Sequence, residues 1–192
     1  MKSRLAIFDL DGTLYDTRAV NFKAYQLALR EYKIELDENF FYKNCNGKFY
    51  KQFLPIINST LTEADIKTIH DYKKSIYYSC LQNATPNENL IQIIKNIHQE
   101  YYIALVTTAS KKNAEEILMY FGHYNLFDLI ITQEDTIKKK PDPEGFLKAM
   151  QYFNIKPEQT IIFEDSDDGV SAALQCGASV CKIFDYCTLT VM

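Results

Sequence analysis

Two aspartates stand two residues apart, directly after a short apolar run near the start of the chain. The run is Leu5–Phe8, and Asp9, Asp11 and Gly12 follow it. Such a run predicts a buried strand, and in an open α/β sheet ligands bind beyond the carboxyl ends of the strands. A carboxylate placed there can bind Mg²⁺ or attack a phosphoryl group, and a second one can transfer protons. The pair alone is equally typical of a strand that ends in an acidic turn.

Polar side chains follow three later apolar runs in the same way. The runs and the residues after them are Tyr102–Val106 with Thr107 and Thr108, Leu129–Ile131 with Lys140 beyond a loop, and Thr160–Phe163 with Glu164 and Asp165. Because the carboxyl ends of parallel strands meet at one edge of a sheet, we expect these side chains to lie near Asp9 and Asp11. Each one by itself is also typical of a loop or a helix start.

A site assembled from these residues would hold acidic groups, a hydroxyl and an ammonium. Crowded carboxylates repel one another, and a bound cation offsets that repulsion. Mg²⁺ fits because it prefers oxygen ligands and is held by one or two carboxylates together with substrate phosphate. Lys140 could neutralise the nucleophile and the transferred group, and Thr107 could bind a phosphate oxygen.

Helical patterns separate the predicted strands. The helical ranges are 90–97, 114–121, 146–153 and 167–176, and a last apolar run over 178–183 predicts a fifth strand. Asp142 and Pro143 are typical of an N-cap and the first residue of a helix. Strands that alternate with helices predict an α/β fold, with a Rossmann-like parallel sheet covered on both faces.

Residues 17–84 carry helical patterns and no strand pattern. We expect their many aromatic residues to form a core of their own, and Pro55 to end one of the helices. A break over 84–87 precedes the alternating strands and helices. We therefore expect an α/β core domain of residues 1–16 and 85–192, and an inserted all-helical cap domain of residues 17–84 that acts as a lid over the strand ends.

Composition and charge set limits on the partners. The 192 residues are 47% hydrophobic and 24% charged, and the formal net charge is −4. This balance gives no electrostatic reason to expect nucleic acid or an anionic membrane as a partner. No apolar run approaches the roughly 20 residues that cross a bilayer, and the first run is too short for a signal peptide. We expect a cytoplasmic protein, a monomer rather than an oligomer.

The cysteines and histidines do not indicate a metal site. The five cysteines are an odd number without a Cys-x-x-Cys pair, which predicts free thiols in a reducing compartment: Cys45, Cys80, Cys176, Cys181 and Cys187. The three histidines stand apart from one another, and we expect surface or half-buried side chains at His70, His98 and His123.

These motifs resemble those of the haloacid dehalogenase superfamily over nearly the whole chain. The matching segments are Asp9-Leu10-Asp11-Gly12-Thr13, Thr107, Lys140 before Pro141, and Glu164-Asp165-Ser166 with Gly169 after it. The helical segment between the first two resembles the helical cap of the family. The resemblance places the chain near the phosphoglycolate phosphatase and β-phosphoglucomutase-like branch.

The resemblance implies a role for each matching residue. Asp9 would be the nucleophile that forms an aspartyl-phosphate, and Asp11 would protonate the leaving alcohol and then activate water. Thr107 and Lys140 would hold the phosphoryl group, with help from the backbone at Thr108.

The resemblance also implies a metal site. Mg²⁺ would be held by Asp9, by the backbone carbonyl of Asp11 and by Asp165, with Glu164 in or just outside that shell. Dehalogenases of the family carry no aspartate at the position of Asp11, so its presence favours phosphate esters as substrates. Mutases typically carry a histidine early in the cap, where this chain has Asn21, and this favours hydrolysis.

The leading hypothesis is a Mg²⁺-dependent phosphatase that acts on a small phosphorylated metabolite. A sugar-phosphate mutase and a non-catalytic phosphate-binding protein are the alternatives. Lys23 leaves open a phosphonate-cleaving activity, which uses a cap lysine, although a lone lysine on an exposed helix is typically solvated.

Lys48, in the candidate specificity loop 44–51, would bind a second acidic group of the substrate or form a solvated basic turn. The short segment after residue 183 would affect the sheet edge and not the chemistry.

Overall fold

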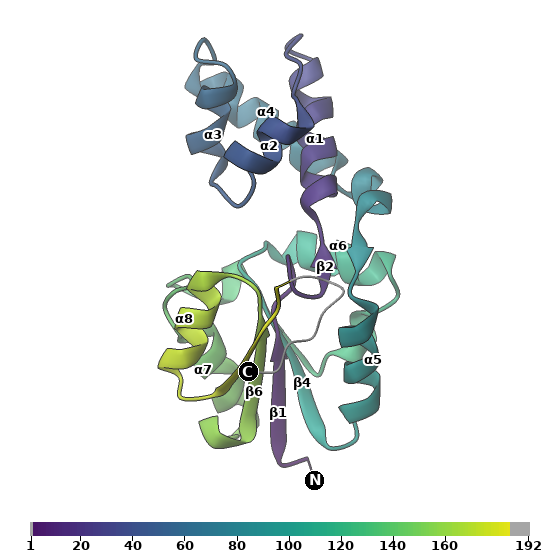
Figure 1. The fold of residues 1–192 in the computed structure, drawn as a ribbon, viewed down its shortest axis with the longest axis vertical. Coiled ribbons are helices and arrows are strands. Elements are labelled where there is room, and N and C mark those ends of the chain that lie inside the picture. The colour runs from purple at the N-terminus through teal and green to yellow at the C-terminus, as the bar shows by residue number, and fades with distance from the viewer. Residues whose placement is uncertain (1, 185–192) are drawn as a thin grey trace. The chain divides into compact units, whose positions relative to one another are not determined.

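The computed structural model describes residues 2–184, and its backbone divides into two compact units (Figure 1). The α/β unit consists of residues 1–16 and 85–192, and the helical unit consists of residues 17–84. Cys187 lies outside the described residues. Cys45, Cys80, Cys176 and Cys181 carry free thiols.

The α/β unit alternates strands with helices along the chain. Its strands are β1 (Arg4–Phe8), β2 (Tyr15–Asp16), β3 (Thr85–Pro86), β4 (Tyr101–Val106), β5 (Leu129–Ile131), β6 (Thr160–Glu164) and β7 (Ser179–Lys182). Its α-helices are α5 (Glu88–Ile97), α6 (Lys111–Tyr120), α7 (Glu144–Phe153) and α8 (Asp167–Gln175). Short 3₁₀ turns at Tyr124–Leu126, Gln133–Asp135 and Pro157–Gln159 join these elements.

Five of these strands form one parallel sheet in the order β5-β4-β1-β6-β7. The first strand in the sequence therefore lies at the centre, paired with β4 on one side and β6 on the other. Phe8, at its carboxyl end, is in register with Leu105 of β4 and Phe163 of β6. The register brings the residues that follow these three strands to one edge of the sheet. The α/β fold with a Rossmann-like core is confirmed.

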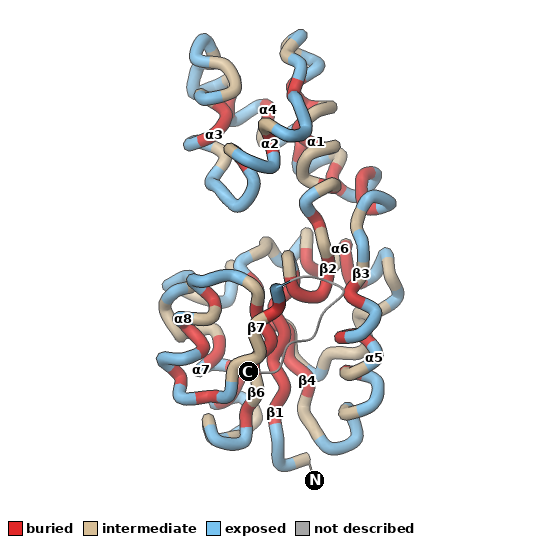
Figure 2. The backbone as a smooth tube through the Cα atoms, viewed as in Figure 1, coloured by how far each residue is buried: buried red, intermediate tan, exposed pale blue. Residues whose placement is uncertain are grey.

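Helices cover both faces of the sheet. The helices α7 and α8 lie on one face and α5 and α6 on the other (Figure 1). Alternate residues of β1 pack against the helices on the two faces, because successive side chains of a strand point to opposite faces. Leu5 and Ile7 pack with Phe146 and Met150 of α7 in one buried cluster. The central strands are buried along almost their whole length (Figure 2), which explains why they are apolar runs and not alternating patterns.

A small antiparallel pair lies where the chain leaves the α/β unit and returns to it. Tyr15 of β2 is opposite Pro86 of β3, and Asp16 is opposite Thr85. The sequence did not predict this pair, because two-residue strands carry no periodic signal. The helix α1 begins directly after β2, at Arg18, with Thr17 as its N-cap residue.

The helical unit contains α1 (Arg18–Arg30), α2 (Glu38–Asn44), α3 (Tyr50–Ile57) and α4 (Glu63–Ile76), followed by a 3₁₀ helix at Tyr78–Asn83. Its core is aromatic, as expected for a segment that packs on itself. The rings of Tyr25, Phe41 and Phe53 are buried, and those of Tyr25 and Phe53 meet edge to face with centroids 5.0 Å apart. The helix α4 begins with a capping box formed by Thr62 and Asp65.

Two local predictions were wrong. Pro55 lies inside α3 and does not end it, since the helix continues for two residues to Ile57. The helix α7 begins at Glu144 with Pro143 as its N-cap residue, one position later than expected. Asp142 still serves the helix start, because its carboxylate accepts the Glu144 N–H at 3.0 Å.

Candidate active site

Asp9 lies where the central strand ends, and its side chain is buried. Its backbone N–H donates to the Phe163 carbonyl at 3.0 Å, which continues the β1–β6 pairing by one residue and fixes the main chain. The residue is 6% exposed. A carboxylate at this depth needs a cationic partner, because desolvation strongly disfavours an unpaired charge.

Lys140 supplies that partner. Its ammonium lies 2.6 Å from Asp9 Oδ1 and 2.5 Å from Glu164 Oε1, and it also donates to the Val106 carbonyl at 3.1 Å. The side chain is 9% exposed. Residues from three strand ends therefore converge on one nitrogen atom.

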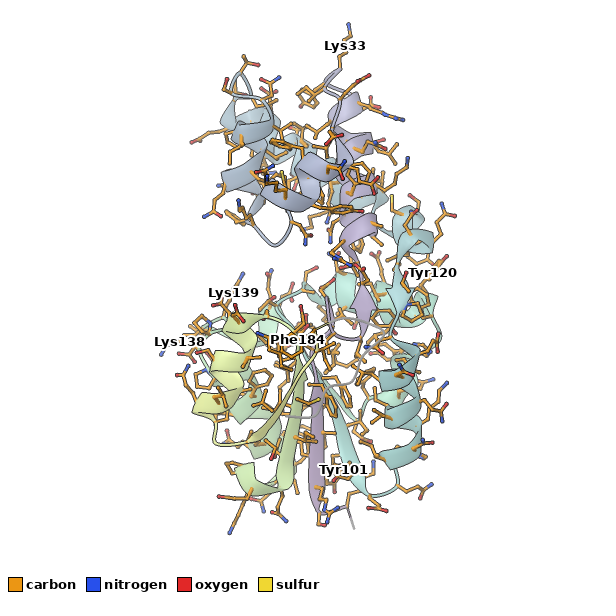
Figure 3. The ribbon with its side chains drawn as sticks, viewed as in Figure 1. Lys33, Tyr101, Tyr120, Lys138, Lys139 and Phe184 are labelled. Carbon is orange, nitrogen blue, oxygen red and sulfur yellow. The ribbon has the colours of Figure 1, made fainter. Side chains whose placement is uncertain are left out.

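The two lysines before it behave differently. Lys138 pairs with Asp142 at 3.3 Å, Lys139 donates to Gln133 at 3.2 Å, and both are exposed at the rim of the α/β unit (Figure 3). Of this run of three lysines, only Lys140 enters the carboxylate cluster.

Glu164 is held from several directions and is 1% exposed. Its Oε1 accepts from Lys140, and its Oε2 accepts from the Ser166 backbone N–H at 2.8 Å and from the Ser166 hydroxyl at 3.0 Å. The backbone of Gly169 in α8 lies so close that a Cβ at that position would overlap the Glu164 carboxylate. Glycine therefore lets the start of α8 approach this side chain.

Asp165 is attached to the loop that follows β1. Its Oδ1 accepts from the Thr13 hydroxyl at 2.8 Å. A Cβ at Gly12, where φ is +91°, would overlap the Asp165 carboxylate. The absence of a side chain at Gly12 thus allows this carboxylate to lie against the main chain next to Asp11. Thr13 belongs to the motif that begins at Asp9, but the sequence did not predict its contact with Asp165.

Thr107 and Thr108 follow β4. The Thr107 N–H donates to the Ile131 carbonyl at 3.0 Å, and its hydroxyl oxygen accepts from the Ala109 N–H at 3.0 Å. With that oxygen engaged as an acceptor, the hydroxyl hydrogen can be directed at a bound oxyanion. Thr107 is buried and Thr108 is exposed.

The pKa values of the two aspartates in this cluster are raised. Burial raises the pKa of Asp9 well above its ordinary value; Lys140 opposes that effect, and Glu164 and Asp165 add to it. Burial also raises the pKa of Asp165 to about 6, against the hydrogen bond from Thr13. Burial alone would lower the pKa of Lys140, but its two carboxylate partners raise it. The cluster holds three carboxylates and one ammonium, so a further positive charge would lower the pKa of both aspartates.

Two other predicted residues are exposed. Asp11 is exposed on the loop after β1, where its backbone forms a bridge with Tyr15. Lys48 is exposed in the helical unit between α2 and α3. Within residues 2–184, no group of three or more His, Cys, Asp or Glu side chains has a metal-binding arrangement.

Asn87 is a buried residue that the sequence reasoning missed. Its backbone N–H donates to the Leu14 carbonyl at 2.8 Å, and its side-chain amide donates to the Thr13 carbonyl at 3.3 Å. Its side-chain oxygen also accepts the Leu90 N–H at 3.3 Å and caps α5. An asparagine before a helix is a cap signal, but only the fold shows that the cap also holds the loop after β1.

Comparisons with known proteins agree with this geometry. A family model described as haloacid dehalogenase-like hydrolase matches residues 6–183. The chain therefore belongs to this family of hydrolases, and the resemblance seen in its motifs is confirmed.

Its relatives share most of their length with it. The phosphorylated carbohydrates phosphatase of Thermotoga maritima is 29% identical over 176 residues, which is 89% of this chain and 80% of the relative. The fructose-1-phosphate phosphatase YqaB of Escherichia coli K12 is 27% identical over 171 residues, or 89% and 91%. The structure of CbbY from Rhodobacter sphaeroides in complex with phosphate has the same fold, with a TM-score of 0.77 at 22% identity over 97% of this chain and 88% of that one.

None of the helices between residues 2 and 184 is long and apolar enough to cross a membrane.

Proposed function

We propose that the protein is a Mg²⁺-dependent phosphatase that hydrolyses a small phosphorylated metabolite through an aspartyl-phosphate. The observation that carries the proposal is the Lys140 ammonium bridging Asp9 and Glu164 at the end of the central strand. This arrangement holds a buried carboxylate next to a fixed positive charge, which suits attack on a phosphoryl group. The names of the Thermotoga and Escherichia relatives support phosphorylated carbohydrates as the substrate class.

Asp9 and Asp11 share the two chemical steps. A carboxylate oxygen of Asp9 attacks phosphorus, the bond from phosphorus to the ester oxygen breaks, and Asp11 gives its proton to the leaving alcohol. Water then attacks the aspartyl-phosphate, Asp11 takes the proton from that water, and the bond from phosphorus to Asp9 breaks. Inorganic phosphate leaves, and both aspartates return to their starting state.

Three groups would hold the phosphoryl oxygens. Lys140 is fixed next to Asp9 and neutralises charge on the transferred group. Thr107 lies at the end of the neighbouring strand and can donate its hydroxyl hydrogen. The backbone at Thr108 would add a further donor.

Asp9, Asp165 and the backbone carbonyl of Asp11 would hold Mg²⁺. The donor set fits, because Mg²⁺ takes oxygen ligands and needs only one or two carboxylates besides water and substrate phosphate. The Asp165 carboxylate lies close to the main chain at Gly12. This closeness supports a metal site that Asp165 shares with the neighbouring carbonyl of Asp11. Both oxygens of Glu164 already accept hydrogen bonds, so we assign it to holding Lys140. Bound Mg²⁺ would neutralise charge on the phosphoryl group.

The helical unit would act as the cap that selects the substrate, with Lys48 as a candidate contact for a second acidic group. Cap closure over such a site would exclude water and complete substrate binding. We keep two predictions, that the protein is cytoplasmic and that it is a monomer. Size-exclusion chromatography is the first test of the second.

A mutase is the second candidate, and the contacts of Asn21 count against it. Its side-chain amide donates to the Thr17 carbonyl at 3.2 Å and accepts from Lys73 at 2.7 Å. An amide cannot transfer a proton in the way a histidine does. Hydrolysis therefore needs no proton-transferring side chain at the position of Asn21, whereas isomerisation would need one.

The test is phosphate release from a panel of phosphorylated metabolites, with Mg²⁺ and with EDTA. Asp9→Asn should lower the release by about a thousandfold or more, because it removes the attacking oxyanion. Asp71→Asn is a matched control, since this exposed carboxylate pairs only with its helix neighbour Lys67 among the contacts seen. Release that survives in Asp9→Asn would overturn the mechanism.

The same panel separates the alternatives. Formation of an isomeric sugar phosphate, dependent on a bisphosphate activator, would establish the mutase. Phosphate binding without release from any ester would establish a non-catalytic binding protein.

A further inference from the structure

Tyr15 is bonded through its main chain to the loop that carries Asp11. Its N–H donates to the Leu10 carbonyl at 3.0 Å, and its carbonyl accepts from the Gly12 N–H at 2.9 Å. The backbone of Asp11 also forms a bridge with Tyr15. Asp11 therefore lies between two residues whose backbones are both tied to Tyr15, and a shift of Tyr15 would move it.

The Tyr15 side chain is anchored on the turn that follows α6. The residue is fully buried, and its ring stacks on Phe121 with centroids 5.0 Å apart. Its hydroxyl oxygen lies 2.7 Å from Nδ1 of His123. A buried tyrosine hydroxyl needs a partner of this kind, because an unpaired polar group in the interior is costly.

His123 is itself fixed by the end of α6. Gly122 turns the chain with φ of +71°, and the His123 N–H then donates to the Leu118 carbonyl at 2.8 Å. Burial and Lys95 lower the pKa of this histidine, while Glu88 opposes them. The imidazole is therefore neutral at pH 7, with one ring nitrogen able to accept and the other to donate.

We propose that His123 and Tyr15 are positioning residues for Asp11, and that their hydrogen bond keeps this acid aligned with the leaving oxygen. The inference rests on the proposed function. The two residues touch neither the carboxylate cluster around Lys140 nor the phosphoryl-binding Thr107 among the contacts of the described residues. Their loss should therefore weaken proton donation more than attack by Asp9.

The dependence of the rate on the leaving group reports this difference. An alkyl phosphate expels an alkoxide, which needs a proton from Asp11. An aryl phosphate such as p-nitrophenyl phosphate expels a stable phenolate, which does not. A misplaced acid slows the first step with the alkyl phosphate and spares that step with the aryl phosphate, whereas a general loss of folded enzyme slows both equally. The later attack of water on the aspartyl-phosphate, in which Asp11 also takes part, is the same for the two substrates.

The experiment measures kcat/KM on a sugar phosphate that the wild type hydrolyses and on p-nitrophenyl phosphate, because kcat/KM reports the steps up to departure of the alcohol or phenolate and leaves out the later attack of water. Tyr15→Phe and His123→Phe should each lower kcat/KM about tenfold on the sugar phosphate, a part of the hundredfold to ten-thousandfold that general acids contribute. They should lower it less than about twofold on the aryl phosphate. The double variant should be no worse than either single one, because both changes remove the same hydrogen bond.

The helical unit offers a matched control. The Tyr25 hydroxyl lies 2.9 Å from Nδ1 of His70, so the pair has the same chemistry in the other compact unit. Tyr25→Phe removes an equivalent hydrogen bond and should leave the ratio of the two rates unchanged. Thermal unfolding of all variants shows which of them are folded at the assay temperature.

Three results would overturn the inference: equal losses on both substrates, no loss on either, or the same change of ratio in Tyr25→Phe. An inactive wild type would count against the proposed phosphatase and is seen before any variant is compared. His123→Asn is a second variant with a smaller polar side chain, and partial recovery relative to His123→Phe would support the hydrogen bond as the cause.

Discussion

Replacing Gly169 by alanine sets helix propensity against a close contact in the candidate site. The residue lies in the first turn of α8, where its N–H donates to the Ser166 hydroxyl at 3.0 Å. Alanine is favoured over glycine in a helix by about 1 kcal/mol, so the sequence alone predicts stabilisation. The structure predicts the opposite, because the added Cβ would overlap the Glu164 carboxylate.

The balance follows from how firmly Glu164 is held. Its carboxylate is bonded to Lys140 and twice to Ser166, so it cannot move aside without loss. Overpacking typically costs about 1–3 kcal/mol, and a displaced hydrogen bond to a charged group about 1.5–3 kcal/mol. After subtraction of the propensity gain, we expect Gly169→Ala to lower the free energy of unfolding by about 1.5–5 kcal/mol.

The assay is thermal unfolding followed by circular dichroism, with EDTA present. For a chain of this size about 1 kcal/mol corresponds to about 2–4 °C in Tm, so we expect a fall of roughly 3–20 °C. Ser171 lies on the exposed side of the same helix. The difference in Tm between Ser171→Gly and Ser171→Ala measures helix propensity alone, since both variants lack the hydroxyl. A Gly169→Ala protein at least as stable as the wild type would refute the reasoning.

Two further predictions concern charge in the same cluster. Lys140→Met leaves Asp9 and Glu164 buried without their ammonium, which should cost about 3–5 kcal/mol at neutral pH. The folded-state pKa of Asp9, already raised by burial, would rise further above the unfolded one, so the deficit in Tm should shrink from pH 8 to pH 5 as this carboxyl takes up a proton; a deficit independent of pH would contradict this. Because burial raises the pKa of Asp165 to about 6, protons should compete with Mg²⁺ below that pH. Calorimetric titration should show Mg²⁺ affinity falling about tenfold per pH unit below about pH 6, and Asp165→Asn should bind more weakly with a flatter pH dependence.

The fold could be predicted because its strands are buried on both faces. Central strands of this kind are continuous apolar runs, and Leu5–Phe8 and Tyr102–Val106 are such runs. Once each run is taken as a parallel strand, the residues after it must lie at one edge of the sheet. The convergence of Asp9, Lys140 and Glu164 was therefore within reach of the sequence.

The supports of the site were not predictable in the same way. Thr13 contacts Asp165 across 152 residues of sequence, and Asn87 contacts Thr13 across 74. Neither contact follows from spacing, because each depends on how α5 and the strand ends pack. Gly169 shows the same limit: its place in the helix was expected, but the carboxylate next to it was visible only in the structure.

These supports explain how a loop could hold the acid of the proposed reaction. The segment after β1 is fixed by Asp165 through the Thr13 hydroxyl, by Asn87 through the Thr13 carbonyl, and by His123 through the Tyr15 hydroxyl. Each anchor comes from a different element, so the segment is held on several sides while the Asp11 side chain stays exposed. An acid must reach both a leaving oxygen and a water in the proposed reaction, and a fixed backbone beneath an exposed side chain meets both demands. A single anchor would restrain one direction of movement and leave the acid free to shift in the others.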